Sequence, residues 1–349
     1  MSSEAPVLGI DLGTATVSAG YAFTGQEPEP LDMHVRSKRL SPHYRSEILI
    51  SEDGVVSRPD YKGPVASRIG NLTTLLGRPP QIIAGAPHGI NNLIELLVAP
   101  AIDAADRIAA PLEHIAAVVP DHWPDYTIAQ YCKALESTGL HVTPVSAAES
   151  QASYAELMPT EGLVTCFNIG VQAATLTIAI PDADRRFSEV HVASPRGGLD
   201  AIAQSIVVHI AERIAQNFQP SAAWLDEAKQ VGKRILRAAQ KADNPQALIT
   251  AELPAPLKRV NVRSSWINDL VEDHMRQALE ELSTKEVRNL WQDDVDAGIH
   301  KTLLVSGGFS TFRPVGNAIR TNIGPWRAQP CPEAIAAMGA ARFVAEGRS

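Results

Sequence analysis

The sequence predicts an α/β protein built as two lobes of one design. Three observations favour this fold class. The chain has 349 residues, which is too many for one small hydrophobic core. Apolar strand patterns alternate with helical patterns along the whole length. A pair of apolar strands joined by a short polar turn occurs near the N-terminus and returns about half-way along the chain, as expected for an internal repeat.

The first half opens on a predicted hairpin. Residues Val7–Asp11 and Thr16–Phe23 alternate β-branched and small residues around a Gly-Thr turn. Residues 26–47 are rich in proline and charge, so we expect an exposed excursion that adds little to the core. Residues 89–109 have helical spacing, although Pro100 should kink or split that helix. The other expected elements are a strand at 115–119, a helix at 125–137, a strand at 142–145 and a helix from Glu149.

The second half repeats the opening pattern. Residues 163–180 form an apolar strand, a short polar turn with one glycine, and a second apolar strand. Asn168 takes the place of Asp11 and Gly170 the place of Gly13, an offset of 168 − 11 = 157 residues. The elements expected after this hairpin are a strand that ends near 193, a turn at 195–198, helices at 199–216, 221–239 and 264–282, a strand at 301–306 and a helix at 332–344.

Composition and charge argue against several classes of protein. The formal charge of −8 argues against a protein that binds nucleic acid by neutralising its phosphates. No apolar run is long enough to cross a bilayer, and no signal-peptide pattern opens the chain. We therefore expect a cytoplasmic protein without membrane insertion or a nucleic-acid partner, present as a monomer or weak dimer.

A strand-end aspartate followed by Gly and Thr has a physical use in binding phosphate. Gly13 permits a tight turn with unshielded backbone N–H groups, and the Thr14 hydroxyl adds another donor. The Asp11 carboxylate would repel a phosphate, so it needs a magnesium ion or its water shell between them. Two such turns facing each other would hold a polyphosphate between the lobes. A hairpin whose turn begins with aspartate for structural reasons alone is the alternative.

Several motifs resemble, in order along nearly the whole chain, the nucleotide-binding (ATPase) domain of DnaK-type heat-shock chaperones in the actin-like ATPase superfamily. Asp11–Ser18, DLGTATVS, is similar to the first phosphate hairpin of that family, D-x-G-T-x-x-S. The stretch VVPDHWPDYTIAQYCKALESTGLHVTPVSAAESQAS resembles a strand, helix and strand that lead to a connecting helix, with Glu149 at the family's glutamate position. Three later motifs also match: RGGLD from Arg196, LLVSGGFSTFRP from Leu303, and CPEAIAAMGAA in the last helix.

The resemblance implies a two-lobed actin-like ATPase fold. Each lobe would be a ribonuclease-H-like mixed sheet flanked by helices, with ATP or ADP and Mg²⁺ in a cleft between the lobes. Lobe I would span 1–160 and lobe II 161–330, and residues 331–349 would form a closing helix that packs back on lobe I.

The resemblance also implies roles for individual residues. Asp11 and Glu149 would orient waters bound to magnesium. The implied nucleotide contacts are Gly13, Thr14, Ala15 and Gly170 for the phosphates, Gly197 and Gly198 for phosphates or ribose, Gln230, Lys233 and Arg237 for base and ribose, and Gly307, Gly308 and Arg313 for adenosine. Gln230, Lys233 and Arg237 can share one helical face, for which a solvated polar surface is the alternative.

The second hairpin departs from the family pattern D-x-G-G-G-T-x-D. Asn168 and Thr175 stand in place of its two carboxylates, and Val171 and Gln172 in place of glycines. The family also places a catalytic lysine between the hairpins, but residues 67–87 contain none. Because phosphoryl transfer depends on positioning and charge stabilisation, we expect slow or absent hydrolysis and name no catalytic residue. The sequence also stops after the closing helix, without the family's peptide-binding domain.

The leading hypothesis is a stand-alone, chaperone-like nucleotide-binding protein, at most a weak ATPase, that regulates or adapts an unknown protein partner. A pseudo-ATPase scaffold that binds no nucleotide and works only through protein–protein contacts is the alternative. A kinase for a sugar or an acetate-like acid would need an acidic base that Asn168 and Thr175 do not supply. Actin-like filament formation is a fourth hypothesis, but no long apolar insert marks a filament contact.

Overall fold

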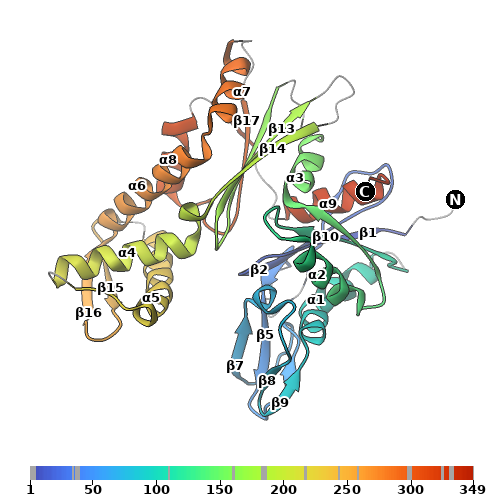
Figure 1. The fold of residues 1–349 in the computed structure, drawn as a ribbon, viewed down its shortest axis with the longest axis horizontal. Helices are drawn as coiled ribbons and strands as arrows, with labels where there is room; N and C mark the ends of the chain where they lie inside the picture. Colours follow the sequence, from blue (N-terminus) through green and yellow to red (C-terminus); the bar gives the residue numbers. More distant parts are fainter. Residues whose placement is uncertain are drawn as a thin grey trace. The chain divides into compact units, whose positions relative to one another are not determined.

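The computed structural model describes residues 5–33, 35, 40–108, 111–158, 162–181, 187–215, 218–242, 244–257, 259–296, 301–323, 326–329 and 334–348. The chain divides into two compact units (Figure 1). Unit 1 comprises Met1–Thr160, Ala179–Val190 and Cys331–Ser349, and unit 2 comprises Glu161–Ile178 and His191–Pro330. Both units combine mixed sheets with helices, so the α/β class predicted from the sequence is confirmed.

The main sheet of unit 1 has the strand order β11-β10-β1-β2-β3, and β4 pairs with β2 as well. β1 (Val7–Leu12) and β2 (Thr16–Ala22) form the antiparallel hairpin predicted from the sequence. The parallel strands beside β1 are β10 (His114–Val119) and β11 (His141–Ser146), and the antiparallel ones beside β2 are β3 (Glu29–Pro30) and β4 (His43–Arg45). Residues that follow β1, β10 and β11 therefore gather at one edge of the sheet, where α/β proteins commonly bind ligands.

Three helices lie between or after the parallel strands of unit 1. They are α1 (Ile90–Asp106), α2 (Asp125–Glu136) and α3 (Ala147–Ala155). α1 continues through Pro100, so the predicted split does not occur. Proline removes one helical hydrogen bond, but Leu93, Ile94 and Leu97 on the same helix are fully buried, and their burial offsets that loss.

The segment 26–47 contributes more to the core than its composition suggests. Leu31 and Met33 are buried, and the Tyr44 hydroxyl donates a hydrogen bond to the Leu97 carbonyl at 2.7 Å. The predicted excursion with little core was therefore wrong, because the few apolar side chains between the prolines and charges face inward. Short elements that the sequence pattern did not predict follow it: β5 (Glu47–Ser51), β6 (Val56–Ser57), β7 (Val65–Gly70), η1 (Leu72–Leu75), β8 (Gln81–Ile83) and β9 (Ala86–His88).

The last helix, α9 (Ile335–Ala345), packs on β1 and against α3 within unit 1 (Figure 1). A Cβ atom on Gly9 would lie 1.8 Å from the Ala337 carbonyl oxygen, and one on Gly339 would lie 1.8 Å from the Ser150 carbonyl oxygen. The backbone of α9 can approach β1 and α3 this closely only because both positions lack a side chain.

Glu156 joins the end of α3 to the C-terminal residues. Its carboxylate accepts hydrogen bonds from Arg342 at 2.7 Å and from the two terminal nitrogens of Arg348 at 2.7 and 2.8 Å. The Glu156 side chain is only 5% exposed. Burial by itself would raise the pKa of Glu156, but the Arg348 and Arg342 guanidinium groups together hold that pKa below its ordinary value.

Glu156→Gln should lower the free energy of unfolding by about 2 kcal/mol at pH 7, because Arg342 and Arg348 lose one of the two carboxylates that they share and only Glu346 is left to balance both charges. The folded-state pKa of Glu156 is depressed, so its contribution is present above the unfolded-state pKa and is lost as the pH falls. Urea titrations at pH 7 and pH 4 measure both effects. Equal stability of the two proteins at pH 7 would contradict a stabilising role for this cluster.

The second large sheet has the strand order β14-β13-β12-β17-β18, and it belongs to unit 2 except for the parts of β13 and β14 within Ala179–Val190, which belong to unit 1. β12 (Val164–Ile169) and β13 (Ala174–Pro181) flank the second predicted turn, and β14 (Phe187–Ser194) follows them. β17 (Lys301–Ser306) runs parallel to β12, and β18 (Trp326–Gln329) runs parallel to β17. Counted from the first strand of each hairpin, the order matches unit 1. The two units therefore share a sheet topology as well as a repeated sequence pattern.

The remaining elements of unit 2 are mostly helices. In chain order they are η2 (Pro195–Gly197), α4 (Leu199–Ile214), α5 (Ala222–Lys241), β15 (Leu248–Glu252), β16 (Arg259–Arg263), α6 (Ser264–Leu282), α7 (Lys285–Asp296) and α8 (Arg313–Ile323). The apolar stripe predicted for α5 is buried from Trp224 to Leu236, although Leu225 is half-buried. α4 and α5 cross closely at Gly232, where a Cβ would lie 2.0 Å from the Ala203 carbonyl oxygen. The sequence pattern had not predicted α7, α8, β15 or β16.

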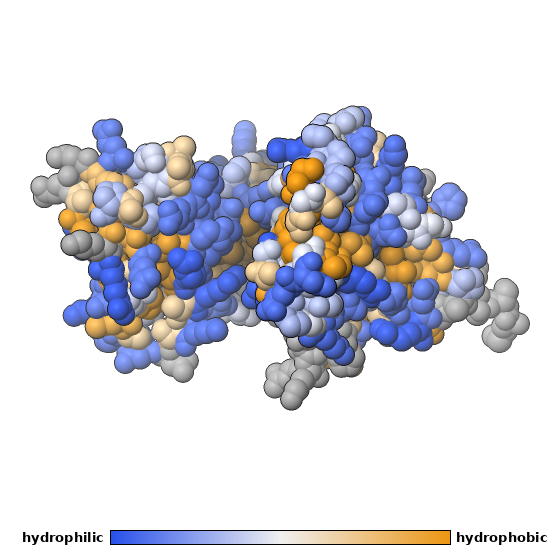
Figure 2. All heavy atoms as spheres, turned by 90° about the horizontal axis from the view of Figure 1, so that it is seen from below, coloured by the Kyte–Doolittle hydropathy of each residue, from blue (hydrophilic) through white to orange (hydrophobic). Residues whose placement is uncertain are grey.

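Hydrophilic residues cover most of the face drawn in Figure 2, with apolar patches between them. Large apolar side chains that reach the surface include Ile82, Leu248 and Tyr126. Within the part of the chain that the structure describes, no helix is both long and apolar enough to span a bilayer.

Candidate functional site

The turn between β1 and β2, here called turn 1, closes through one backbone hydrogen bond. The Gly13 N–H donates to the Thr16 carbonyl at 3.0 Å, and a Cβ at Gly13 would lie 3.1 Å from that oxygen. The Ala15 carbonyl accepts from the Ser46 N–H at 2.9 Å, which anchors the turn to the segment before β5. Among the described residues, no partner uses the N–H groups of Thr14 and Ala15. Turn 1 therefore offers two backbone donors to a ligand.

The turn between β12 and β13, turn 2, closes in the same way. The Gly170 N–H donates to the Ala173 carbonyl at 2.9 Å, so donor and acceptor both lie 157 residues after their counterparts in turn 1. Turn 2 differs in its further contacts. The carbonyls of Gly170 and Val171 accept from the N–H groups of Leu199 and Asp200, at 3.0 and 2.9 Å. Two N–H groups in the first turn of α4, which have no partner within the helix, therefore donate to turn 2.

Asp11 is a partly buried carboxylate near the end of β1. Burial raises the pKa of Asp11 from 3.8 to about 6. None of the described residues donates a hydrogen bond to its carboxylate. The Tyr131 hydroxyl on α2 is fully buried and has no hydrogen-bond partner among the described residues. Burial first, and then the Asp11 charge, raise the pKa of Tyr131. A desolvated acid and an unsatisfied buried hydroxyl both cost stability, and groups with perturbed pKa values cluster at functional sites.

Glu149 has a structural role at the start of α3. It forms a capping box with Ser146: the Ser146 N–H donates to Glu149 Oε2 at 3.0 Å, and the Glu149 N–H donates to Ser146 Oγ at 3.0 Å. Asp121, just after β10, accepts from the Ala148 N–H at 3.4 Å. Burial, followed by the charges of Glu149 and Asp121, raises the pKa of Glu189. Asp121 and Glu149 therefore lie at this edge of the sheet, and Glu189, on the part of β14 that belongs to unit 1, is within reach of their charges.

Asp11 and Glu149 fit a hydrated cation better than a cation that the protein coordinates directly. Within the described residues, no three His, Cys, Asp or Glu side chains are arranged to hold a metal ion. Asp11 has uncommitted carboxylate oxygens, and the capping box occupies only one oxygen of Glu149. Mg²⁺ commonly keeps several of its waters and contacts few carboxylates, so these residues are compatible with a magnesium ion bound through water.

The strand ends of unit 2 carry the predicted adenosine turn. The Ser306 hydroxyl at the end of β17 donates to Asn168 Oδ1 at the end of β12, at 3.1 Å. Gly307 has φ of +94°, and a Cβ there would lie 2.3 Å from the Ile169 carbonyl oxygen, so local structure alone requires this glycine. Gly308 is different: it is exposed, and a Cβ there would meet no atom within 4 Å. Packing does not explain Gly308, which leaves its bare backbone open to a ligand.

Gly197 and Gly198 are explained by packing within unit 2. A Cβ on Gly197 would lie 2.4 Å from the Ala174 Cβ, and one on Gly198 would lie 2.4 Å from the Gln172 carbonyl carbon. Both glycines are buried. They allow the start of α4 to rest on turn 2, and their contact with a nucleotide stays a prediction.

One residue on the predicted base-binding face of α5 already has a partner within the protein. Lys233 Nζ forms an ion pair with Asp200 Oδ1 at 2.5 Å, which joins α5 to the first turn of α4. Gln230 and Arg237 are exposed on the same helix, and Arg313 is exposed at the start of α8. Thr175, on β13, is half-buried. These residues all belong to unit 2, and their proposed contacts with base and ribose stay predictions.

Tyr131 and Ser306 were not predicted as site residues. A tyrosine inside a helical apolar pattern is usually a core residue. The sequence around Tyr131 does not indicate that its hydroxyl lacks a hydrogen-bond partner. Ser306 precedes the predicted Gly-Gly turn, and its register beside Asn168 depends on the parallel pairing of β12 with β17.

No family model and no curated protein matches this chain. The function is therefore inferred from the residues and their geometry.

Proposed function

We propose that the chain is a two-lobed protein of the actin-like ATPase fold that binds ATP or ADP, hydrolyses it slowly or not at all, and acts as a regulator or adaptor of a protein partner. One observation carries this proposal. Two sheets of the same strand order each hold a glycine turn after their first strand, and the closing hydrogen bonds of the two turns are equivalent. An unrelated hairpin would have no reason to recur with both the turn and the sheet order preserved.

In the proposed complex the two turns hold one phosphate chain. Turn 1 contributes the N–H groups of Thr14 and Ala15, and Gly308 lets the adenosine lie against bare backbone. Asp11 and Glu149 would hold magnesium through its waters, and the ion would neutralise phosphate charge. The bound cation would also favour the ionised form of Asp11, which burial otherwise disfavours.

Slow or absent hydrolysis follows from the groups at turn 2. The amide of Asn168 is neutral, and its Oδ1 already accepts a hydrogen bond from Ser306, so it cannot act as a base. Arg68, a cation near the family's lysine region, pairs with Glu47 at 3.3 Å. Loss of a base and of a phosphate-positioning cation together removes most of the electrostatic stabilisation that phosphoryl transfer needs.

A scaffold that binds no nucleotide is the second candidate, and the contacts of turn 2 favour it. The Leu199 and Asp200 N–H groups that a phosphate could use already donate to Gly170 and Val171. Such a protein would keep the fold for protein contacts alone.

Thermal unfolding in the presence of ATP, ADP and MgCl₂ tests the proposal. Millimolar nucleotide should raise the Tm of the wild-type protein by several degrees, because a ligand that binds only the folded state stabilises it. Gly308→Leu should abolish that rise without lowering the Tm of the free protein, since Gly308 is exposed and a Cβ at this position meets no protein atom within 4 Å.

Gly89→Leu is the matched control, because a Cβ at Gly89 also meets nothing within 4 Å and Gly89, at the start of α1, is not among the proposed nucleotide contacts. It should respond to nucleotide like the wild type. If the wild-type Tm does not move, the scaffold candidate replaces the nucleotide proposal; if Gly308→Leu responds fully, the adenosine does not lie at Gly308.

A further inference from the structure

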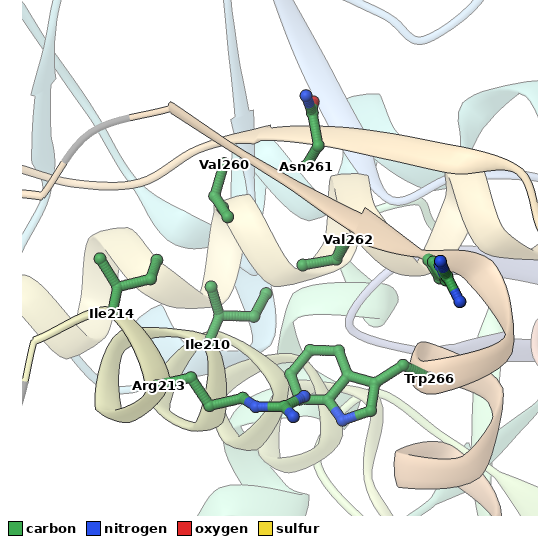
Figure 3. Close-up of a pocket in the computed structure, with 8 residues that line it drawn as sticks. Ile210, Arg213, Ile214, Val260, Asn261, Val262 and Trp266 are labelled. Atoms are coloured by element: carbon green, nitrogen blue, oxygen red, sulfur yellow. The ribbon is translucent and has the colours of Figure 1, made fainter.

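A cavity of about 290 Å³ opens in unit 2 between α4, β16 and the first turn of α6 (Figure 3). Its apolar walls are Ile210 and Ile214 on α4, Val260 and Val262 on β16, and Trp266 on α6. Ile210 is buried, whereas 49% of Ile214 is exposed, so the cavity is open to the surface. Its size and lining suit one aliphatic or aromatic side chain.

The charged residues of the cavity are all positive. Arg213 and Arg263 line it, and no acidic residue does. The Arg213 guanidinium lies 4.9 Å from the centre of the Trp266 ring, and the two side chains overlap below β16 in the view of Figure 3. Neither arginine forms a salt bridge with any residue that the structure describes. On a chain with a formal charge of −8, this local positive charge favours an acidic ligand over a second copy of the chain.

One edge of the adjoining strand is open. Among the residues that the structure describes, β15 and β16 form a sheet of two strands, and no described strand pairs with the far edge of β16. The Ser264 N–H donates to the Ala247 carbonyl at 2.9 Å, and antiparallel pairing alternates, so the Asn261 N–H and C=O point away from β15. No backbone group among the described residues bonds to them. An unpaired edge is a template for an added strand.

We propose that β16 and this cavity bind an extended acidic segment of a partner protein. The segment pairs with the open edge at Asn261, inserts one apolar side chain between α4 and β16, and sets carboxylates against Arg213 and Arg263. Backbone pairing fixes its direction, the cavity selects the apolar residue, and the arginines select negative charge. The inference gives a chemical class to the partner in the proposed adaptor role, on which it rests, but it requires no nucleotide.

Fluorescence anisotropy tests the proposal with a defined probe. The probe is a fluorescein-labelled peptide that alternates threonine with aspartate or glutamate and carries one central leucine. It should bind the full-length protein, whereas a peptide with serine for the leucine and a peptide with lysines for the acids should bind at least about tenfold more weakly.

Asn261→Pro is the most selective variant. Proline cannot donate a hydrogen bond to an added strand, but the lost N–H lies on the edge away from β15, so the existing hairpin keeps its backbone hydrogen bonds. The side-chain hydrogen bond from Thr250 Oγ1 to Asn261 Oδ1 is lost with proline and with alanine alike. We expect affinity for the acidic peptide to fall by about tenfold, since one backbone bond is lost and the ring obstructs pairing. Asn261→Ala, which keeps the N–H, is the matched control and should bind like the wild type.

The double variant Arg213→Glu/Arg263→Glu gives an independent result if Asn261→Pro fails to fold. It should lose affinity for the acidic peptide by at least about tenfold, because attraction becomes repulsion. Arg234→Glu, an exposed arginine on α5 outside the cavity, should not lose it.

Three results would overturn the proposal. The acidic and basic peptides bind equally well, the Arg213→Glu/Arg263→Glu variant binds the acidic peptide as tightly as the wild type, or the acidic probe does not bind at millimolar concentration. A monomer–dimer equilibrium that Asn261→Pro abolishes would instead assign the edge to a second copy of this chain. The nucleotide titration of the wild-type protein is read separately, so failure of the peptide site and failure of the proposed nucleotide site remain distinguishable.

Discussion

Gly339→Ala should lower the free energy of unfolding by more than about 3 kcal/mol, because overpacking at a rigid contact exceeds what small shifts can relieve. The new Cβ would lie 1.8 Å from the Ser150 carbonyl oxygen and 3.3 Å from the Tyr154 Cβ. Both neighbours belong to α3, which is buried from Ser150 to Ala155 and cannot move away without opening the core of unit 1. Chemical denaturation followed by circular dichroism measures the effect.

Gly316→Ala is the matched control, because it makes the same substitution in another helix, α8, where the new Cβ meets nothing within 4 Å. Alanine is the better helix former by about 0.5–1 kcal/mol, so this variant should be slightly more stable than the wild type. The two substitutions should therefore change stability in opposite directions. If both proteins gain stability, α9 does not approach α3 as closely as Gly339 indicates.

Asp11→Asn should raise the free energy of unfolding at pH 7 by up to about 3 kcal/mol, the free-energy equivalent of raising a pKa from 3.8 to about 6. The folded-state pKa of Asp11 lies above its unfolded value, so the wild-type protein loses stability as the pH rises from 3.8 through 6. Asparagine carries no charge and avoids this loss. The value is an upper one, because part of Asp11 reaches solvent.

The gain from Asp11→Asn should therefore shrink as the pH falls from 7 to 5, which urea titrations at both pH values measure. Asp53→Asn is a control of the opposite kind: the Ser51 hydroxyl lowers the pKa of Asp53, so neutralising it should not stabilise the protein. If Asp11→Asn is less stable than the wild type at pH 7, the Asp11 carboxylate accepts a stabilising interaction. It would then not be a desolvated acid that lowers the stability of the free protein. With Mg²⁺ and nucleotide present, the wild-type protein should recover part of the difference.

The sequence was most informative where one face of an element is buried. Both hairpins, their glycine turns and the apolar stripe of α5 follow from periods of two and 3.6 residues, and the structure has all of them. The pairing of strands that lie far apart in the chain was harder to predict from the sequence. The repeat suggested two lobes of one design, but only the structure gives the same strand order in both sheets.

Short strands and mixed segments could not be predicted in the same way. β6 has two residues and β8 and β9 have three each, which is too few to establish a period. The segment 26–47 hides Leu31, Met33 and Tyr44 among prolines and charges, and composition averages over such isolated inward residues. α1 passes through Pro100 because tertiary burial outweighs local helix propensity.

The candidate site could be predicted in type but not in environment. Asp11 and Gly13 were expected from one short motif, yet neither the raised pKa of Asp11 nor the unsatisfied hydroxyl of Tyr131 has a sequence pattern, because both arise from burial by distant segments. The structure likewise shows Glu149 in a capping box, Lys233 paired with Asp200, and Gly198 packed on Gln172. These contacts give the three residues local roles beside the nucleotide roles that the resemblance implied.

Hydrogen–deuterium exchange with increasing ATP and MgCl₂ tests most directly whether the two turns hold one ligand. The amides of Thr14 and Ala15 in turn 1, and of Val171 and Gln172 in turn 2, should become protected together and at the same nucleotide concentration, although 157 residues separate the turns. Exchange that stays unchanged in both turns, or slows in only one of them, would contradict a shared phosphate site.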